Sequence, residues 1–179
     1  DVANYNSPGI CLGGSVTFTA SGATSYSWGS KAAPLDDVAS TYKLAVSLRK
    51  LRSAYAGSAI RLRRSSDNIE ADFGFIGNDL NTAAISTWLG SANGFCVKLY
   101  DQSGNNNEMV PLSVGAQPLY VASGSSMNNK PILRFTTSQN LKSTFNFTTP
   151  YTATIAARYS GSTDSATSRR WFSHQPLWA

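Results

Sequence analysis

Apolar and polar residues alternate in several short runs along this chain, and glycine, asparagine or proline separates the runs. In AIRLRR, Ile60 and Leu62 alternate with Arg61 and Arg63, which is the two-residue period of a half-buried strand. Similar runs predict strands at FGFIG, GFCVKLYD, QPLYV, KPILRF, LKSTFNF and YTATIAARYS. Short strands at regular spacing with turn residues between them predict an antiparallel β-sandwich.

One longer segment has the period of a helix. Between residues 42 and 55, Leu44, Leu48, Leu51 and Tyr55 fall at helical spacing with the cations on the other side, and Gly57 is expected to end the helix. The SSDNIEAD stretch further on has no apolar period and is expected to be a polar loop.

A second, shorter helix is predicted in DLNTAAISTWLG. Asp79 and Asn81 are its candidate N-caps. Its apolar side is expected to consist of Leu80, Ala84, Trp88 and Leu89. The fold class predicted from the whole pattern is mainly β, a concanavalin A-like antiparallel sandwich with one or two short helices near its start.

The pattern also predicts three parts of the chain. Residues 1–30 read as a hairpin-like pair of strands, and about thirty residues cannot bury a core of their own. Residues 31–41 are expected to be a linker, and residues 42–179 the sandwich. Because RRWFSHQPLWA begins one more strand, the sandwich is expected to be incomplete at its C-terminus.

Composition favours a protein that works outside the cell. The chain is 41% hydrophobic but only 14% charged, and glycine, serine, threonine and asparagine fill the difference. That balance is typical of turn-rich extracellular β-proteins, so an extracellular or cell-surface location is expected. No apolar run approaches the ~18 residues of a transmembrane helix, and no membrane insertion is expected.

The net charge of +5 raises the question of nucleic acid. Six cations gather in one stretch: Arg49, Lys50, Arg52, Arg61, Arg63 and Arg64. A nucleic-acid-binding surface normally combines such a patch with a recognisable helix or aromatic platform, and the sequence shows neither. The patch is expected to be the solvated side of a helix and the strand after it, with no nucleic acid as partner.

Cysteine and histidine are scarce. Two cysteines are too few for a disulfide framework or a zinc site, but Cys11 and Cys96 form a candidate disulfide if the protein is secreted. The single His174 excludes a histidine-rich metal centre.

The stretch YDQSGNNN, from Tyr100 to Asn107, follows a predicted buried strand and carries the densest polar chemistry in the chain. It has three interpretations: a turn that ends the strand, a sugar or metal site, or half of a catalytic carboxylate pair. In the first, Asp101 and Ser103 hold the turn, Gly104 supplies a positive φ, and Asp101 also accepts a bond from an arginine of RLRR.

In the second interpretation, planar polar side chains hold sugar hydroxyls and an aromatic face covers the apolar side of the ring. The candidate ligand-binding residues are Tyr100, Asp101, Gln102, Asn105, Asn106, Asn107 and Trp88. The only cofactor considered is Ca²⁺, which takes several oxygen ligands. Its candidate ligands are Asp67, Asn68 and Asp72.

Two stretches resemble known families. Residues 7–28, SPGICLGGSVTFTASGATSYSW, resemble a recurrent phrase that opens immunoglobulin-like and PKD-like repeats in large surface proteins of Bacteroidetes. SLRKLRSAYAGSAIRLRRSSDNIEADFGF followed by GFCVKLYDQSGNNN resembles the front of the α-L-arabinofuranosidase B catalytic-domain family, and still more its non-enzymatic relatives in bacterial surface and phage-like proteins. The later strands resemble concanavalin A-like and laminin-G-like lectin sandwiches.

The second resemblance implies a lectin-like fold more strongly than an activity. A retaining glycosidase needs two carboxyl groups about 5–5.5 Å apart. Glu70 and Glu108 are the only glutamates, and the family's catalytic pair is expected downstream of YDQSGN, beyond these residues. The expected function is non-catalytic binding or adhesion, with carbohydrate or another surface protein as partner. The alternatives are the N-terminal part of an arabinofuranosidase-like hydrolase and a structural spacer or assembly subunit of a surface filament.

Overall fold

The structure is a computed structural model, and it describes part of the second of two units into which the chain divides between Ser30 and Lys31. The described residues are 33–36, 42–124, 128–136, 138–143, 153 and 156–157. The segment predicted to be immunoglobulin-like or PKD-like lies outside them, as does most of the predicted linker. The boundaries predicted at residues 30 and 41 stay predictions.

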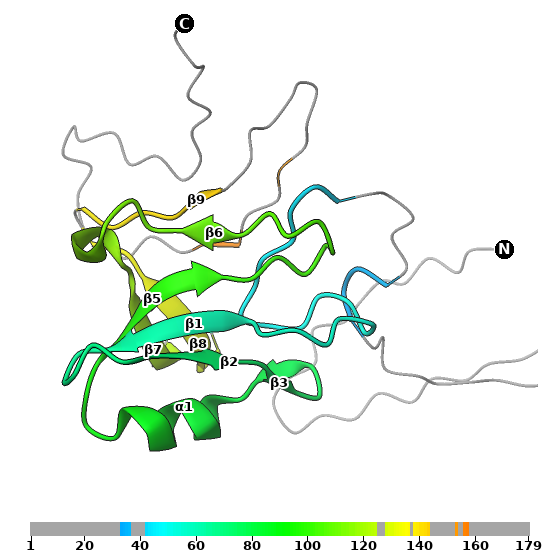
Figure 1. Ribbon diagram of the computed structural model, residues 1–179. Helices are drawn as coiled ribbons and strands as arrows, with labels where there is room; N and C mark the ends of the chain where they lie inside the picture. Colours follow the sequence, from blue (N-terminus) through cyan, green and yellow to red (C-terminus); the bar gives the residue numbers. More distant parts are fainter. Residues whose placement is uncertain are drawn as a thin grey trace, which may run out of the picture. The chain divides into compact units, whose positions relative to one another are not determined.

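Seven of the described strands form one antiparallel sheet (Figure 1). Five of them follow the order β2 (Glu70–Phe73), β1 (Ile60–Arg64), β5 (Gly94–Leu99), β6 (Met109–Val110) and β9 (Lys142–Ser143). The other two are β7 (Leu119–Gly124), which also pairs with β5, and β8 (Lys130–Arg134), which pairs with β7. A separate hairpin joins β3 (Phe75–Ile76) to β4 (Asp79–Leu80), and a 3₁₀ helix, η1 (Val114–Ala116), precedes β7.

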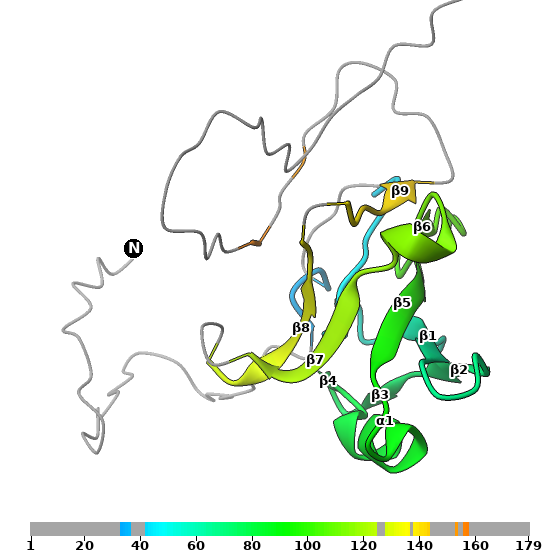
Figure 2. The same cartoon turned by 90° about the vertical axis from the view of Figure 1, so that its left-hand side faces the viewer.

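The sheet divides at β5. Phe95 of this strand lies opposite Leu119 of β7, and Leu99 lies opposite Met109 of β6, so two strands share one edge. In Figure 2, β7 and β8 lie on one side of β5 and β1 and β2 on the other, while the helix α1 (Thr82–Leu89) lies at one end. The prediction of a mainly β, antiparallel sandwich is confirmed.

The alternation in AIRLRR produces β1 as expected. Ile60 and Leu62 are fully buried, while Arg61 and Arg63 lie on the opposite face. The register between β1 and β5 shifts after Arg61, which lies opposite Lys98. These two strands therefore present cations on the face that the core does not use.

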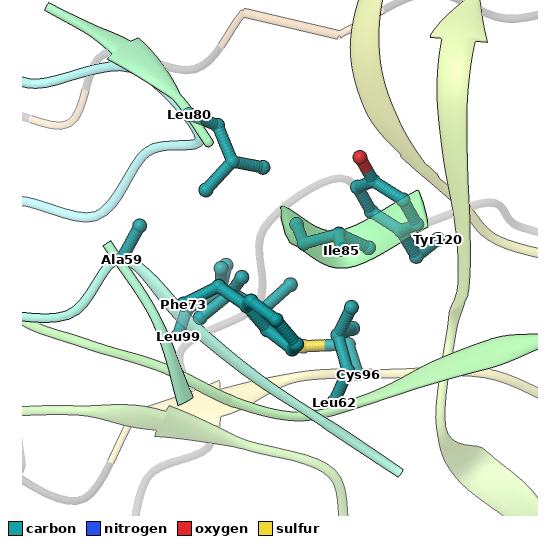
Figure 3. Packing of buried hydrophobic residues seen from close by; sticks show 9 residues of the cluster. Ala59, Leu62, Phe73, Leu80, Ile85, Cys96, Leu99 and Tyr120 are labelled. Carbon is teal, nitrogen blue, oxygen red and sulfur yellow. The ribbon is translucent and has the colours of Figure 1, made fainter. Parts of the chain in front are cut away.

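Nine buried residues form the core (Figure 3). They are Ala59, Ile60, Leu62, Phe73, Leu80, Ile85, Cys96, Leu99 and Tyr120. Ile85 is fully buried and comes from α1, so the helix closes the core against β1 and β5. Burying side chains such as Leu62 and Ile85 stabilises the fold by roughly 1.5–3 kcal/mol each. The Tyr120 hydroxyl is also buried, and it has no hydrogen-bond partner among the described residues.

Cys96 packs in this core, and no disulfide joins it to another described residue. Burial raises the pKa of the thiol to about 12, so it is protonated and unreactive at neutral pH. Its predicted disulfide partner, Cys11, lies outside the described residues, and the bridge stays a prediction.

The predicted helix in DLNTAAISTWLG is confirmed as α1. Of the two candidate caps, Asn81 caps it, because its side-chain oxygen accepts a hydrogen bond from the Ala84 amide at 3.1 Å. The helix ends at Gly90, whose φ of 58° favours glycine. None of the described helices has the length and apolar character to cross a membrane.

The helix predicted for residues 42–55 is wrong. The structure has no regular element there, and Val46 and Leu48, only two residues apart, both pack against the core as in an extended chain. Leu44, Leu48 and Leu51 fit a helical period, but Leu44, Val46 and Leu48 equally fit a period of two. The loop predicted for SSDNIEAD is shorter than expected, because its end forms β2.

The later predicted strands are confirmed in QPLYV (β7) and KPILRF (β8). LKSTFNF forms only the two-residue strand β9 among the described residues, and most of YTATIAARYS lies outside them.

Candidate functional site

The stretch YDQSGNNN begins where β5 ends and folds back against residues 42–52. We call residues 101–107 the clamp loop and residues 42–52 the strap. Asp101 and Gln102 are only 5% and 1% exposed, although both are polar. Buried polar groups need internal partners, and the partners here come mainly from the backbone of the strap.

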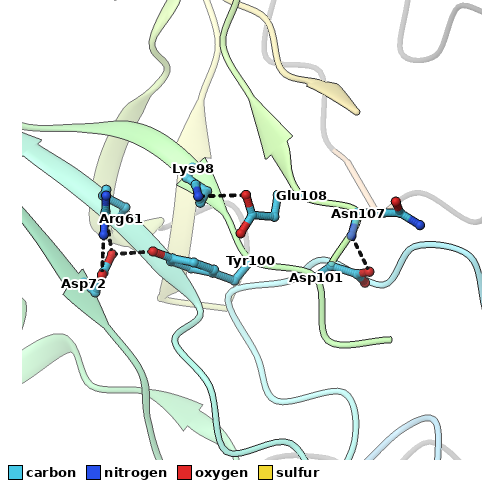
Figure 4. A network of polar contacts seen from close by, with 7 residues as sticks. All are labelled: Arg61, Asp72, Lys98, Tyr100, Asp101, Asn107 and Glu108. Atoms are coloured by element: carbon cyan, nitrogen blue, oxygen red, sulfur yellow. Dashed lines mark hydrogen bonds and ion pairs between the residues drawn. The ribbon is translucent and has the colours of Figure 1, made fainter. Parts of the chain in front are cut away.

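The Asp101 carboxylate accepts four hydrogen bonds. Its Oδ1 accepts from the amides of Ala45, at 2.8 Å, and Ser103, at 2.9 Å. Its Oδ2 accepts from the Ser103 hydroxyl at 2.6 Å and from the Asn107 amide at 3.0 Å (Figure 4). Both oxygens are therefore occupied by donors of the protein itself.

Gln102 joins three backbone groups of the strap. Its Oε1 accepts from the Leu51 amide at 2.7 Å, and its Nε2 donates to the carbonyls of Ser47, at 3.1 Å, and Arg49, at 3.0 Å. Its own amide donates to the Ala45 carbonyl at 2.7 Å. The carboxamide supplies the hydrogen bonds that a neighbouring strand would otherwise provide.

The asparagines complete the clamp loop. Asn105 Nδ2 donates to the Tyr42 carbonyl, and Asn107 Nδ2 donates to the Lys43 carbonyl at 2.8 Å. Asn106 has a φ of 58°, a left-handed conformation that asparagine tolerates. The clamp loop thus binds the strap along most of its length.

These contacts test two details of the turn interpretation. Asp101 and Ser103 do hold the turn, as expected. The predicted bond from an arginine of RLRR to Asp101 is wrong: Arg61 instead binds Asp72, at 2.7 Å and 2.6 Å. The link to YDQSGNNN passes through Tyr100, whose hydroxyl donates to Asp72 at 2.7 Å.

Tyr100 and Asp101 point in different directions, as Figure 4 shows. The Tyr100 ring lies under Lys98 Nζ, 5.1 Å from the ring centroid, and Lys98 also pairs with Glu108 at 2.7 Å. Burial, followed by the bond to Asp72, raises the pKa of Tyr100 to about 12, so the phenol stays a donor. The Asp72 carboxyl has a lowered pKa, chiefly because of its hydrogen bonds from Arg61.

Trp88, the other predicted aromatic ligand residue, belongs to the packing around α1. Its ring lies 5.3 Å from the Phe73 ring, and the Arg64 guanidinium carbon lies 4.8 Å from the Trp88 centroid. The structure therefore brings Asp101, Gln102 and the asparagines together but places Tyr100 and Trp88 elsewhere. Ligand binding by this set stays a prediction.

The three candidate Ca²⁺ ligands each bind a different arginine. Arg64 bonds to both Asp67 oxygens, Arg63 Nη1 donates to Asn68 Oδ1 at 2.6 Å, and Arg61 holds Asp72. Within the described part of the chain, no group of three or more histidine, cysteine or acidic side chains could hold a metal ion. The calcium site stays a prediction that these contacts do not support.

The Asp72 contacts predict a pH dependence of stability. A carboxyl whose folded-state pKa is lowered stabilises the fold above its unfolded pKa, and this contribution is lost as the pH falls through the folded pKa. The unfolding free energies of the wild type and Asp72→Asn should therefore differ most above about pH 4 and converge below it. Urea titrations between pH 7 and pH 2.5 measure this difference. In an Arg61→Gln background it should be small throughout, and a constant difference across the range would contradict the assignment.

A separate groove of about 460 Å³ opens between residues 50–58 and the β3–β4 hairpin. Its lining includes Lys50, Tyr55, Ser58 and Phe75, with glycines between them. The Tyr55 and Phe75 rings meet edge to face, 6.4 Å apart. A Cβ atom at Gly57 would lie 2.5 Å from the Tyr55 hydroxyl, so glycine at this position leaves room for the ring.

Sequence reasoning missed this groove. The sequence pattern places Tyr55 on the apolar side of a helix that does not form, and it predicts only a strand in FGFIG. The signal available in the sequence is the glycines at positions 57, 74 and 77, which line the groove together with the half-buried rings of Tyr55 and Phe75.

Comparison with known proteins gives a partial similarity. No protein-family model matches the sequence, and no curated protein matches it. A crystal structure of arabinofuranosidase complexed with arabinofuranosyl-α-1,2-xylobiose matches 59% of the chain at 19% identity, with a TM-score of 0.49. A GH54 α-L-arabinofuranosidase soaked with a cyclic sulfate inhibitor matches 35% at 28% identity, with a TM-score of 0.33.

A point mutant of a GH54 α-L-arabinofuranosidase soaked with 4-nitrophenyl α-L-arabinofuranoside matches 49% of the chain at 24% identity, with a TM-score of 0.41. The chain spans only 26%, 14% and 21% of these three proteins. All three TM-scores lie below one half. The proteins are arabinofuranosidases, the kind of protein that the motifs of this sequence also resemble.

Proposed function

We propose that this chain is part of a secreted or cell-surface protein that binds carbohydrate without cleaving it. The observation that carries the proposal is the groove beside Tyr55 and Phe75. Ligand pockets of roughly 300–1,000 Å³ are common in proteins, and this groove of about 460 Å³ falls in that range. Aromatic rings cover the apolar faces of a sugar, and Ser58 and the glycine backbone offer polar groups for its hydroxyls.

The non-catalytic part of the proposal follows from how the described carboxylates are used. Six of the seven described carboxylates are already engaged: Asp101 is bonded to backbone and Ser103, Asp36 to Ser53, and Asp67, Asp72, Asp79 and Glu108 to cations. The seventh, Glu70, is exposed on β2. A glycosidase acid needs a raised pKa, whereas the resolved carboxyl shifts, at Asp36, Asp67 and Asp72, are all downward. The hydrolase alternative rests on the sequence resemblance to the arabinofuranosidases.

A glycan array with the 179-residue chain tests the proposal. Binding to at least one plant, algal or bacterial glycan is expected, and Tyr55→Ala should abolish it. Phe135→Ala is the matched control, because Phe135 is 48% exposed and does not line the groove. Melting curves establish that both variants fold. Absence of any binding would favour the structural spacer, and release of nitrophenol from 4-nitrophenyl α-L-arabinofuranoside would favour the hydrolase.

A further inference from the structure

The walls of the groove are held by backbone hydrogen bonds. The Lys50 amide donates to the Asn78 carbonyl at 2.9 Å, and Arg49 forms an isolated β-bridge with Asp79. On the other side, the Ala59 amide donates to the Phe73 carbonyl at 2.7 Å. The groove is therefore formed before any ligand arrives, which reduces the entropy cost of binding.

The aromatic wall is fixed in the same way. The Tyr55 hydroxyl donates to the Ser58 carbonyl at 2.8 Å, and burial is the main reason why the pKa of Tyr55 is raised. The phenol thus stays protonated and keeps this bond at neutral pH. The Tyr55 side chain cannot swing away from Phe75 about its Cα–Cβ bond without losing this hydrogen bond.

Lys50 gives the groove its charge. Among the described residues that line the groove it is the only charged one. The ion pairs of the described residues involve Arg61, Arg64, Lys98 and Lys130, so the Lys50 ammonium has no carboxylate partner there. Three further cations lie on the same strap: Lys43, Arg49 and Arg52. The strap itself contains no acidic residue, so its potential favours an anion.

Asp101 and Glu108, whose charges add to the raised pKa of Tyr55, are held by the clamp loop and the strap and by Lys98. Two further acidic side chains near this wall are also engaged. Asp79, the first residue of β4, forms the bridge to Arg49 and pairs with Lys130 at 3.3 Å. Asp36 accepts hydrogen bonds from the amide and hydroxyl of Ser53. Neither is part of the groove lining, so neither occupies the position of a bound anion.

We propose that the groove selects a sugar unit that carries an anionic group, with the anion on Lys50 and the ring against Tyr55 and Phe75. This inference rests on the proposed function and adds the ligand class. Uronic acids and sulfated sugars share the required chemistry, since each places a full negative charge on a ring substituent. An ammonium serves either group as a point charge.

Three methyl α-galactosides that differ only at C6 test the inference: the neutral galactoside, the galacturonoside and the 6-sulfate. Their dissociation constants are measured by NMR titration of the ¹⁵N-labelled 179-residue chain. At least one anionic sugar should bind about tenfold more tightly than the neutral one, since a charge-assisted contact contributes roughly 1.4 kcal/mol or more. Comparison of the two anionic arms distinguishes carboxylate from sulfate.

Lys50→Gln should remove the difference between anionic and neutral sugars, so that the ratio of their dissociation constants falls to about one. Lys142→Gln is the matched control, because Lys142 is exposed on β9 and does not line the groove. Equal affinity for all three sugars, or an equal loss in both lysine variants, would overturn the inference and leave carbohydrate binding intact. If the glycan array also shows no binding, both proposals fail.

Discussion

Asp101→Ala is expected to destabilise the protein by roughly 3–5 kcal/mol, one of the largest effects of a single substitution in this chain. Removing the carboxylate leaves the amides of Ala45, Ser103 and Asn107 without their acceptor, and the Ser103 hydroxyl loses one as well. Hydrogen bonds to charged groups contribute about 1.5–3 kcal/mol each, although bonds that share one group are not additive. Thermal melting should show a decrease of about 10 °C.

Asp101→Asn is the informative control for that experiment. The asparagine carbonyl can still accept from Ala45 and Ser103, but its NH₂ group would face the Asn107 amide, which is also a donor. About half of the destabilisation should therefore remain. A melting temperature of Asp101→Ala equal to that of the wild type would show that the strap does not depend on the carboxylate.

The sequence predicts the elements whose pattern is local. The alternation of Ile60 and Leu62 with arginines predicts β1, and an asparagine before AAISTWL predicts the start of α1. In both elements, the side chains that form the sequence pattern are the same side chains that stabilise the strand or the helix. The mainly β fold could be predicted for the same reason.

The strap could not be predicted in this way. Leu44 and Leu48 fit a helical period together with Leu51 and a period of two together with Val46, and no side chain of the strap decides between the two periods. The decision comes from Asp101 and Gln102, more than 50 positions later, which bond to backbone groups of the strap. Every residue has a backbone carbonyl and nearly every residue a backbone amide, so the residue types in the strap do not reveal that the clamp loop binds there.

The clamp loop shows why the binding function of polar residues could not be predicted from the sequence either. Asp, Gln and Asn side chains that could hold a sugar are equally able to hold a peptide backbone, because both offer hydroxyl or amide partners of similar geometry. Exposure separates the two uses: Asp101 and Gln102 are buried, whereas the rings and the lysine of the groove are partly open to solvent. The exposure of a side chain depends on the tertiary fold. It could not be predicted from the sequence, because the sequence pattern predicts a helix for the strap.

The role of Gln102 leads to the second large effect. Gln102→Leu keeps the size of the side chain but leaves the Leu51 amide and the carbonyls of Ser47 and Arg49 without their partner. The expected loss is roughly 2–4 kcal/mol, measured as the free energy of unfolding in urea. Trypsin should also cleave the strap faster, because Arg49 and its neighbours detach more often from the clamp loop.

Gln139→Leu is the matched control, since the Gln139 side chain accepts hydrogen bonds only from Thr136 within its own turn. Gln139→Leu should change the unfolding free energy by no more than about 0.5 kcal/mol. The rate of tryptic cleavage of the strap should stay that of the wild type. Equal cleavage rates for Gln102→Leu and the wild type would show that the strap is held by its apolar side chains alone.

Gln102→Glu separates hydrogen bonding from size. The introduced carboxylate would still accept from the Leu51 amide, but its second oxygen would face the two carbonyls to which Nε2 donates. Only the protonated acid can donate there, so its folded-state pKa should be raised above the unfolded value of about 4.3. Such a group binds a proton on folding, and stability should therefore fall as the pH rises from about 4 through the raised pKa. A variant as stable as the wild type at pH 7 would mean that these two carbonyls do not need a donor.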